Sequence, residues 1–254
     1  MGNSIISYSV LISNYSYREE LFQKRSQHTY DDEADYLKTL QKLTLDSYRC
    51  GIAQLFYHGD VARLQEQFKK AGEYRQKLDT LVADKPPQLR WYSLTSQFLP
   101  LLAVFCTEGI SAVQKLGLTQ FPYLPNYEYE EDFTIGKFFY TVLNDGGIVS
   151  ESFAETLLEE LKELDEQDTT RYALILALKE RESAEFDAAM KTLLQEHADF
   201  FSAMEGTMSC DKEAYSTERM LSIEGWAWIK IARLNGLDVS SDYFAIPQLI
   251  RHLV

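Results

Sequence analysis

The chain has 254 residues, of which 45% are hydrophobic and 13% are aromatic. This composition is sufficient for a large buried core, so an intrinsically disordered chain is excluded. The formal net charge of −14 is unevenly placed: residues 1–127 hold 14 basic and 13 acidic residues, whereas residues 128–254 hold 11 and 26. Because such an acidic field repels phosphate backbones and anionic lipids, we expect a basic protein partner, with no nucleic acid and no membrane.

The remaining bulk properties predict a cytoplasmic protein. The longest apolar runs are too short to span a bilayer, and the first 17 residues lack the basic segment that opens a signal peptide. Cys50, Cys106 and Cys210 are odd in number and far apart, which indicates reduced thiols rather than a disulfide framework or a metal site. We therefore expect no metal and no cofactor.

Helical periodicity dominates the first half of the chain. Residues 31–57 and 60–82 place apolar side chains at spacings of three and four, which predicts two amphipathic helices. Residues 88–107 are apolar on almost every side, which predicts a long, buried helix kinked by Pro100. A short helix over residues 108–116 follows.

Residues 119–133 differ from the segments on either side, because prolines, tyrosines and acidic residues replace the helical pattern. This stretch predicts a loop, and it coincides with the change in charge. We therefore expect an N-terminal helical half over residues 1–120, a loop over 121–133 and an acidic helical half over 134–254, packed together as one unit.

The second half is also helical by its apolar spacing. The expected helices cover residues 134–144, a segment from Ser150, and residues 170–181, 183–204 and 216–235. With about nine helices and no pair of strands, the sequence predicts an all-α fold. We expect an irregular multi-helix bundle whose helical hairpins are arranged like an α–α superhelix.

No pattern in the chain is typical of an enzyme. The histidines, at positions 28, 58, 197 and 252, have no common helical spacing, and no nucleophile elbow, zinc-protease or phosphate-binding motif is present. Glu196 and His197 are adjacent and would point about 100° apart on a helix, which does not suit a shared metal. We therefore expect a binding protein without catalytic activity.

Tyrosines alternate with carboxylates next to the predicted loop, in a pattern that suits the arginines and lysines of a partner. A second group of acids forms a ridge further along the chain. The residues expected to contact a partner are Tyr127, Glu128, Tyr129, Glu130, Glu131, Asp132, Glu159, Glu160, Glu163 and Glu166. An ordinary solvent-exposed helix face would carry the same acids. The sequence therefore leaves both interpretations open, a surface that binds a partner and a surface that is only solvated.

The segment from Glu224 to Arg233 has apolar residues on two sides of the expected helix, with Trp226 on one and Trp228 on the other. Such a helix lies between layers, so we expect both tryptophans to be buried. Gly225 costs a helix interior about 1 kcal/mol relative to alanine. Its presence therefore indicates a close contact with another helix.

A set of short segments in the C-terminal part of the chain forms a further pattern. They lie from Arg171 onward and are Arg171-Tyr172-Ala173, Ser222-Ile223-Glu224-Gly225-Trp226-Ala227, Ala232-Arg233, Gly236-Leu237 and the segment from Tyr243 to Ile250. With these segments the chain resembles the Immunity-49 family of bacterial polymorphic-toxin systems. The chain is also similar, more distantly, to PoNi-type immunity proteins, although it lacks their paired aspartates. The matching residues have the character of core and capping positions.

This resemblance implies an all-helical cytoplasmic protein that binds and neutralises a cognate toxin, often a nuclease. It implies no catalytic residues. An acidic inhibitor that blocks the basic cleft of a nuclease associates fast and tightly. Two alternatives remain: a helical-repeat scaffold or regulator that binds a peptide in a groove, and an enzyme with a pocket of histidines and carboxylates.

Overall fold

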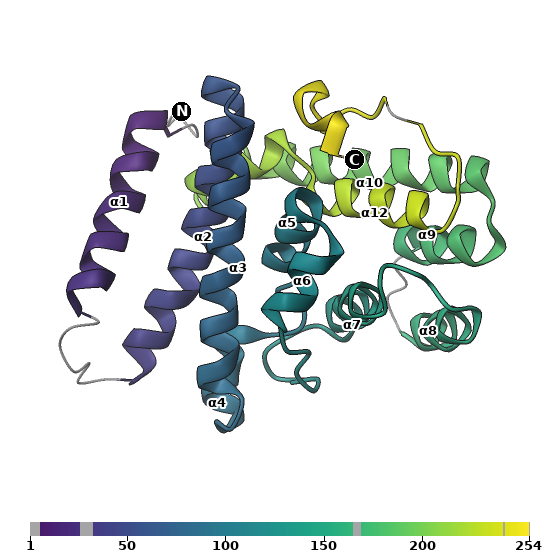
Figure 1. Ribbon diagram of the computed structural model, residues 1–254, viewed down its shortest axis with the longest axis horizontal. Helices are drawn as coiled ribbons and strands as arrows, with labels where there is room; N and C mark the ends of the chain where they lie inside the picture. The colour runs from purple at the N-terminus through teal and green to yellow at the C-terminus, as the bar shows by residue number, and fades with distance from the viewer. Residues whose placement is uncertain (1–5, 26–32, 165–168, 241, 254) are drawn as a thin grey trace.

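The computed structural model describes residues 6–25, 33–164, 169–240 and 242–253. Within these ranges all regular secondary structure is helical, which confirms the all-α class (Figure 1). The elements are labelled α1 to α12, with three short 3-10 helices, η1 to η3. There are more of them than the nine helices expected, because two predicted helices are each divided and one helix was missed.

The missed helix is α1, Tyr8–Arg25, which lies at the edge of the molecule beside α2, Glu33–His58 (Figure 1). α2 pairs with α3, Val61–Val82, in a tight hairpin. Serines interrupt the apolar pattern of α1 and Arg18 lies on its inner side, so its amphipathic character is weak. α2 and α3 have strong apolar stripes, and their bounds agree with the expectation to within two residues.

The prediction of a single helix over residues 88–107 is wrong. Leu94 is extended, with φ −74° and ψ 151°, and the chain is helical only before and after it. Pro100 lies in the first turn of the second piece, where its missing N–H costs nothing, so it begins a helix rather than kinking one. The observed elements are α4, Pro87–Arg90, η1, Trp91–Ser93, α5, Leu99–Glu108, and α6, Ile110–Leu116.

Two helical hairpins form the middle of the second half. α7, Glu130–Asn144, pairs with α8, Glu151–Glu163, and α9, Thr169–Glu180, pairs with α10, Ser183–Met204. α8 begins at the expected place because the Ser150 side chain accepts a hydrogen bond from Phe153 N. A serine in this position satisfies one of the free backbone donors of a helix start.

The expected helix over residues 216–235 is also divided. Leu221 is extended, and the side chain of Ser222 accepts a hydrogen bond from Gly225 N, so a new helix begins at Ile223. A serine followed by an acidic first turn is a helix-start signal, and the apolar spacing concealed it. The elements here are α11, Lys212–Thr217, η2, Glu218–Met220, α12, Ile223–Leu234, and η3, Gln248–Leu253.

One continuous hydrophobic core includes side chains from both halves of the chain, from Tyr48 in α2 to Ile250 in η3. Its largest members are Trp226 and Trp228, both fully buried as expected. The Trp228 ring stacks on Phe138 of α7, with 4.7 Å between ring centroids. α12 therefore lies between other layers of the molecule.

The C-terminal segment returns across the molecule and is held by a half-buried lysine. Lys230 Nζ donates to the carbonyl oxygens of Cys106, at 2.9 Å, and Leu253, at 2.6 Å. Burial lowers the pKa of this ammonium. Lys230 thus joins the end of α5 to η3 from its own position on α12.

Candidate protein-binding site

The acidic residues gather at one end of the hairpin formed by α7 and α8. Lys137 Nζ of α7 lies 2.7 Å from Glu160 Oε1 of α8, which brings the start of α7 close to the end of α8. We call this surface the acidic end. It consists of Tyr127, Tyr129, Glu130, Glu131, Asp132, Glu159 and Glu163.

The start of α7 is helical where a loop was expected. The helix begins at Glu130, so Glu130, Glu131 and Asp132 form its first turn, and Tyr129 is its extended N-cap residue. Carboxylates at a helix N-terminus are stabilised by the helix dipole, by about 0.3–1 kcal/mol each. These acids are therefore held on a regular helix rather than on a flexible loop.

Glu128 is not on the surface, in contrast to the expectation. Its side chain is buried, and its carboxylate accepts hydrogen bonds from Ser96 N, at 3.0 Å, and Leu124 N, at 3.2 Å. A buried carboxylate satisfied by two backbone donors is an anchor for the chain. Its neighbours Tyr127 and Tyr129 are 41% and 81% exposed, so the anchor presents two tyrosines to the solvent.

The ridge on α8 agrees with the expectation in part. Glu159 and Glu163 are exposed, and no cation of the described ranges forms an ion pair with either. Glu160 is half-buried and is neutralised by Lys137. Glu166 lies outside the described residues. The ridge therefore contributes two carboxylates to the acidic end.

A buried ion pair supports the segments that carry these residues. Arg75 and Asp79 of α3 are each 2% exposed at the side chain, with Arg75 Nε 2.7 Å from Asp79 Oδ1. Asp79 Oδ2 accepts from Thr119 N at 2.9 Å, and Arg75 Nη2 donates to Tyr140 OH at 3.1 Å. The pair therefore connects α3 to α7 and to the segment before the two tyrosines.

A close contact between two backbones completes this support. A Cβ atom on Gly136 of α7 would lie 2.3 Å from the carbonyl oxygen of Thr95. Thr95 Oγ1 in turn donates to Phe121 O and accepts from Phe121 N, both at 2.9 Å. Only glycine permits α7 to approach so closely, so the acidic end rests on a rigid base.

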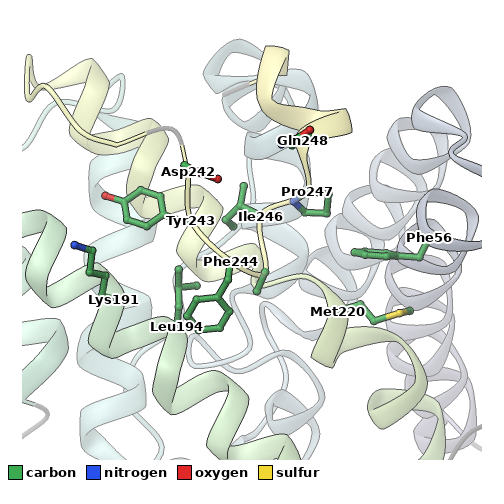
Figure 2. Close-up of a pocket in the computed structure, with 11 residues that line it drawn as sticks. Phe56, Lys191, Leu194, Met220, Asp242, Tyr243, Phe244, Ile246, Pro247 and Gln248 are labelled. Atoms are coloured by element: carbon green, nitrogen blue, oxygen red, sulfur yellow. The ribbon is translucent and has the colours of Figure 1, made fainter.

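A second surface was not predicted from the sequence. An open groove of about 690 Å³ lies between α10, η2, the end of α2 and residues 242–248 (Figure 2). Phe244 and Phe56 line it and are 51% and 39% exposed, and Met220 lies beside them. The apolar residues after Gly236 follow no helical period, and this was the only sign of the groove in the sequence. The groove could not be predicted from them, because the residues that complete it come from three other elements.

The residues that carry the family resemblance have structural roles, as expected. Trp226 is fully buried, and Ser222 caps α12. A Cβ atom on Gly225 would lie 2.8 Å from Leu194 Cδ2 of α10, which confirms the close helix contact. The core and capping character is therefore confirmed for Ser222, Gly225 and Trp226, whereas Phe244 and Leu249 of the same segments are 51% and 54% exposed. None of these residues lies at the acidic end.

Comparison with family models, with curated proteins and with solved structures finds no match for this chain. Within the described ranges, no group of three or more histidines, cysteines and carboxylates is placed to hold a metal ion. No helix of those ranges combines the length and apolar character needed to cross a membrane.

Proposed function

We propose that this chain is an immunity protein that binds a cognate antibacterial toxin and neutralises it by occlusion. The toxin is a basic protein, of which a nuclease is the best example, and the binding takes place in the cytoplasm. The acidic end is the surface that meets it. The family resemblance of the C-terminal segments supports the same proposal.

The observation that carries the proposal is the exposure of Tyr129 among carboxylates on a rigid base. Its side chain is 81% exposed, although a large aromatic ring gains free energy from burial. Tyrosine is enriched among the residues that dominate binding energy, and the carboxylates around it suit guanidinium groups. Because Glu128 and Gly136 fix the backbone nearby, little ordering free energy is lost on binding.

The test is a charge reversal that leaves the fold intact. Glu163 is the last residue of α8, where a lysine is favoured by the helix dipole. Glu163→Lys should weaken binding of the cognate toxin, chiefly by slowing association, and the loss should shrink at high salt. Glu108→Lys is the matched control, because Glu108 is the exposed last residue of α5 and gives the same change in net charge.

Two further variants separate contact from steering. Tyr129→Ala should speed dissociation, since it removes contact area without charge. Reversal of Glu130, Glu131 and Asp132 together should slow association, at some cost to the start of α7. Survival of toxin-expressing cells is the readout, with association rates measured on the purified pair. Full protection and an unchanged association rate in all these variants would show that the acidic end is only a solvated surface.

The groove in Figure 2 favours a second candidate, a helical scaffold that binds an apolar peptide. Two partly exposed phenylalanines face the groove, and Lys191 and Gln248 supply polar groups at its margin. Phe244→Ala should then abolish capture of a peptide partner and leave protection against the toxin intact. The reverse outcome, lost protection with no peptide bound, would assign the groove to the toxin interface.

A further inference from the structure

The inner face of α1 has a charged residue at its centre. Leu11, Tyr15 and Phe22 are buried, and Arg18 lies between them on the same side of the helix, because the spacings are four, three and four residues. Among the side chains of α1 that the structure describes, these three are the buried ones, which is few for a helix of 18 residues. α1 is therefore attached by a mixture of apolar and polar contacts.

The polar contacts concentrate on two carboxylates from different elements. Arg18 Nη2 donates to Asp46 Oδ1 of α2, at 2.6 Å, and to Glu213 Oε2 of α11, at 3.1 Å. Asn14 Nδ2 also donates to Glu213, at 3.2 Å. α1 thus supplies a guanidinium group to both carboxylates, and Glu213 also pairs with Arg49 of α2, with 3.8 Å between Arg49 Nη1 and Glu213 Oε2.

The face of α2 beneath α1 is also polar. Asp46, Ser47 and Cys50 are buried there, and Ser47 Oγ donates to Tyr15 OH of α1 at 3.3 Å. The thiol of Cys50 interacts electrostatically with Tyr15 and Glu19, both on α1. Water can hydrate such groups when α1 leaves, so separation exposes less apolar surface than separation of two core helices.

The other side of α2 contrasts with this face. Ile52 and Leu55 of α2 belong to the main core together with Leu64 and Phe68 of α3, and the Tyr48 ring stacks on Phe68. Leu11 and Tyr15 of α1 are not part of that core. At this end of the hairpin the free energy that holds α2 to α3 is therefore largely independent of α1, whereas at the other end Phe22 of α1 packs in a second, smaller cluster with residues of both helices.

We propose that α1 is a detachable arm, which leaves α2 and α11 as a unit while α2 to α12 stay folded. In leaving, it uncovers the carboxylates of Asp46 and Glu213 and the thiol of Cys50. Arg18 is the central polar contact that holds the arm closed, and Phe22, which packs against α2 and α3, is the main apolar one. The proposal is independent of the acidic end and of the toxin.

The chain contains its own reporters for this motion. Cys50 lies under α1, whereas Cys106 lies in the main core on α5, and its thiol is 3.9 Å from Ile223 O of α12. Both are buried, and burial raises the pKa of the Cys50 thiol to about 11, so neither reacts in the closed fold. Detachment of α1 exposes Cys50 alone, and global unfolding exposes both.

The experiment is thiol labelling of the full-length protein with iodoacetamide under native conditions, followed by mass spectrometry of the peptides that contain each cysteine. We expect Cys50 to react at least tenfold faster than Cys106. Low concentrations of urea should accelerate the labelling of Cys106, which requires global unfolding. They should barely affect the labelling of Cys50, because the local opening that exposes it uncovers little surface.

Arg18→Met tests the contact that closes the arm. This variant keeps the length of the side chain and leaves Asp46 buried without its cation, so labelling of Cys50 should accelerate tenfold or more while Cys106 is unchanged. Lys24→Met is the control, since Lys24 is an exposed residue of the same helix. It should change neither rate.

Equal labelling rates for Cys50 and Cys106 in the wild-type protein would overturn the proposal, because α1 would then leave only on global unfolding. The same conclusion would follow if Arg18→Met accelerated both cysteines equally. If Arg18→Met does not fold, hydrogen exchange of the wild-type protein decides the matter. Amides of residues 8–25 that exchange as slowly as those of α5 would contradict a detachable arm.

Discussion

Arg171 and Glu224 form a two-point ion pair that joins α9 to α12. Arg171 Nε lies 2.6 Å from Glu224 Oε1, and Arg171 Nη2 lies 2.8 Å from Glu224 Oε2. Glu224 Oε1 also accepts a hydrogen bond from Trp228 Nε1 at 3.2 Å. Both charged residues belong to the segments that resemble the Immunity-49 family, so residues 53 apart in the sequence meet in one contact.

Glu224→Gln should lower the free energy of unfolding by about 2 kcal/mol. The side chain of Glu224 is 14% exposed, and its loss of charge removes a two-point ion pair from the partly buried Arg171 guanidinium. The measurement is the urea midpoint at neutral pH. Glu159→Gln on the exposed face of α8 is the control, and it should move the midpoint by no more than about 0.5 kcal/mol. Equal effects of the two variants would show that the ion pair between Arg171 and Glu224 contributes nothing to the free energy of unfolding.

Trp226→Ala should lower the free energy of unfolding by about 3–5 kcal/mol, as is typical for deletion of a large aromatic side chain from a core. Trp226 is fully buried on α12. Thermal melting and urea unfolding measure the loss, and Trp226→Phe should cost less because it leaves a smaller cavity. An unchanged midpoint in Trp226→Ala would mean that the side chain lies at the surface, where it could contact a partner.

Gly136→Ala should destabilise the protein although alanine is favoured over glycine in a helix by about 1 kcal/mol. The new Cβ would lie 2.3 Å from a backbone carbonyl oxygen, that of Thr95, so α7 must shift. Overpacking of this kind costs about 1–3 kcal/mol. The same substitution at Gly225 should cost less, since its nearest atom is the end of the flexible Leu194 side chain. A greater loss at Gly225 than at Gly136 would contradict this ranking.

Asp46 should make the stability fall as the pH rises. Burial raises the pKa of its carboxyl to about 6 from 3.8, although Arg18 and Arg49 lower it and Glu213 raises it further. The folded state therefore binds the proton more tightly, and the stabilisation present below pH 3.8 is lost as the pH passes 6. Between pH 5 and pH 7 this loss amounts to about 1 kcal/mol. The measurement is the difference between the urea midpoints at the two pH values. This difference should lack the contribution of Asp46 in the Asp46→Asn variant.

His197 should act in the opposite direction. Burial lowers the pKa of its imidazole below 6.5, even though Nε2 contacts Glu218 O at 3.1 Å and Glu224 lies nearby. The unfolded state binds the proton more tightly, so His197 contributes stability that is present above pH 6.5 and is lost as the pH falls through the folded pKa. In the wild-type protein His197 therefore offsets part of the stability that is lost between pH 5 and pH 7. The His197→Gln variant should lose more stability over this pH range than the wild-type protein does. A shallower pH dependence in this variant would contradict the assignment.

The sequence predicted helices best where one apolar stripe continues over many turns. α3 and α10 are examples, and their bounds agree with the expectation to within one residue. It failed where apolar residues continue through a break, as around Leu94 and Leu221, because buried loops and buried helices have the same composition. α1 was missed for the opposite reason, since Arg18 interrupts its stripe and finds its partners in other elements.

The candidate site could be predicted only in its outer residues. Tyr129 and Glu130 are exposed, as expected, but Glu128 between Tyr127 and Tyr129 is buried. Neighbouring glutamates are alike in sequence, and the donors that select Glu128 come from Ser96 and Leu124. The turn residues Pro125 and Asn126 were the local signal that the chain folds back at this point.

The bond from Lys230 to the carbonyl oxygen of Leu253 has a consequence for synthesis of the protein. Ile250 is fully buried in the main core, which also contains residues of α2 and α5. That core therefore closes only after the ribosome has released residues 250–253, although the first helices emerge much earlier. During this interval the apolar sides of α2, α3 and α5 lack their final cover, and chaperones have a surface to bind.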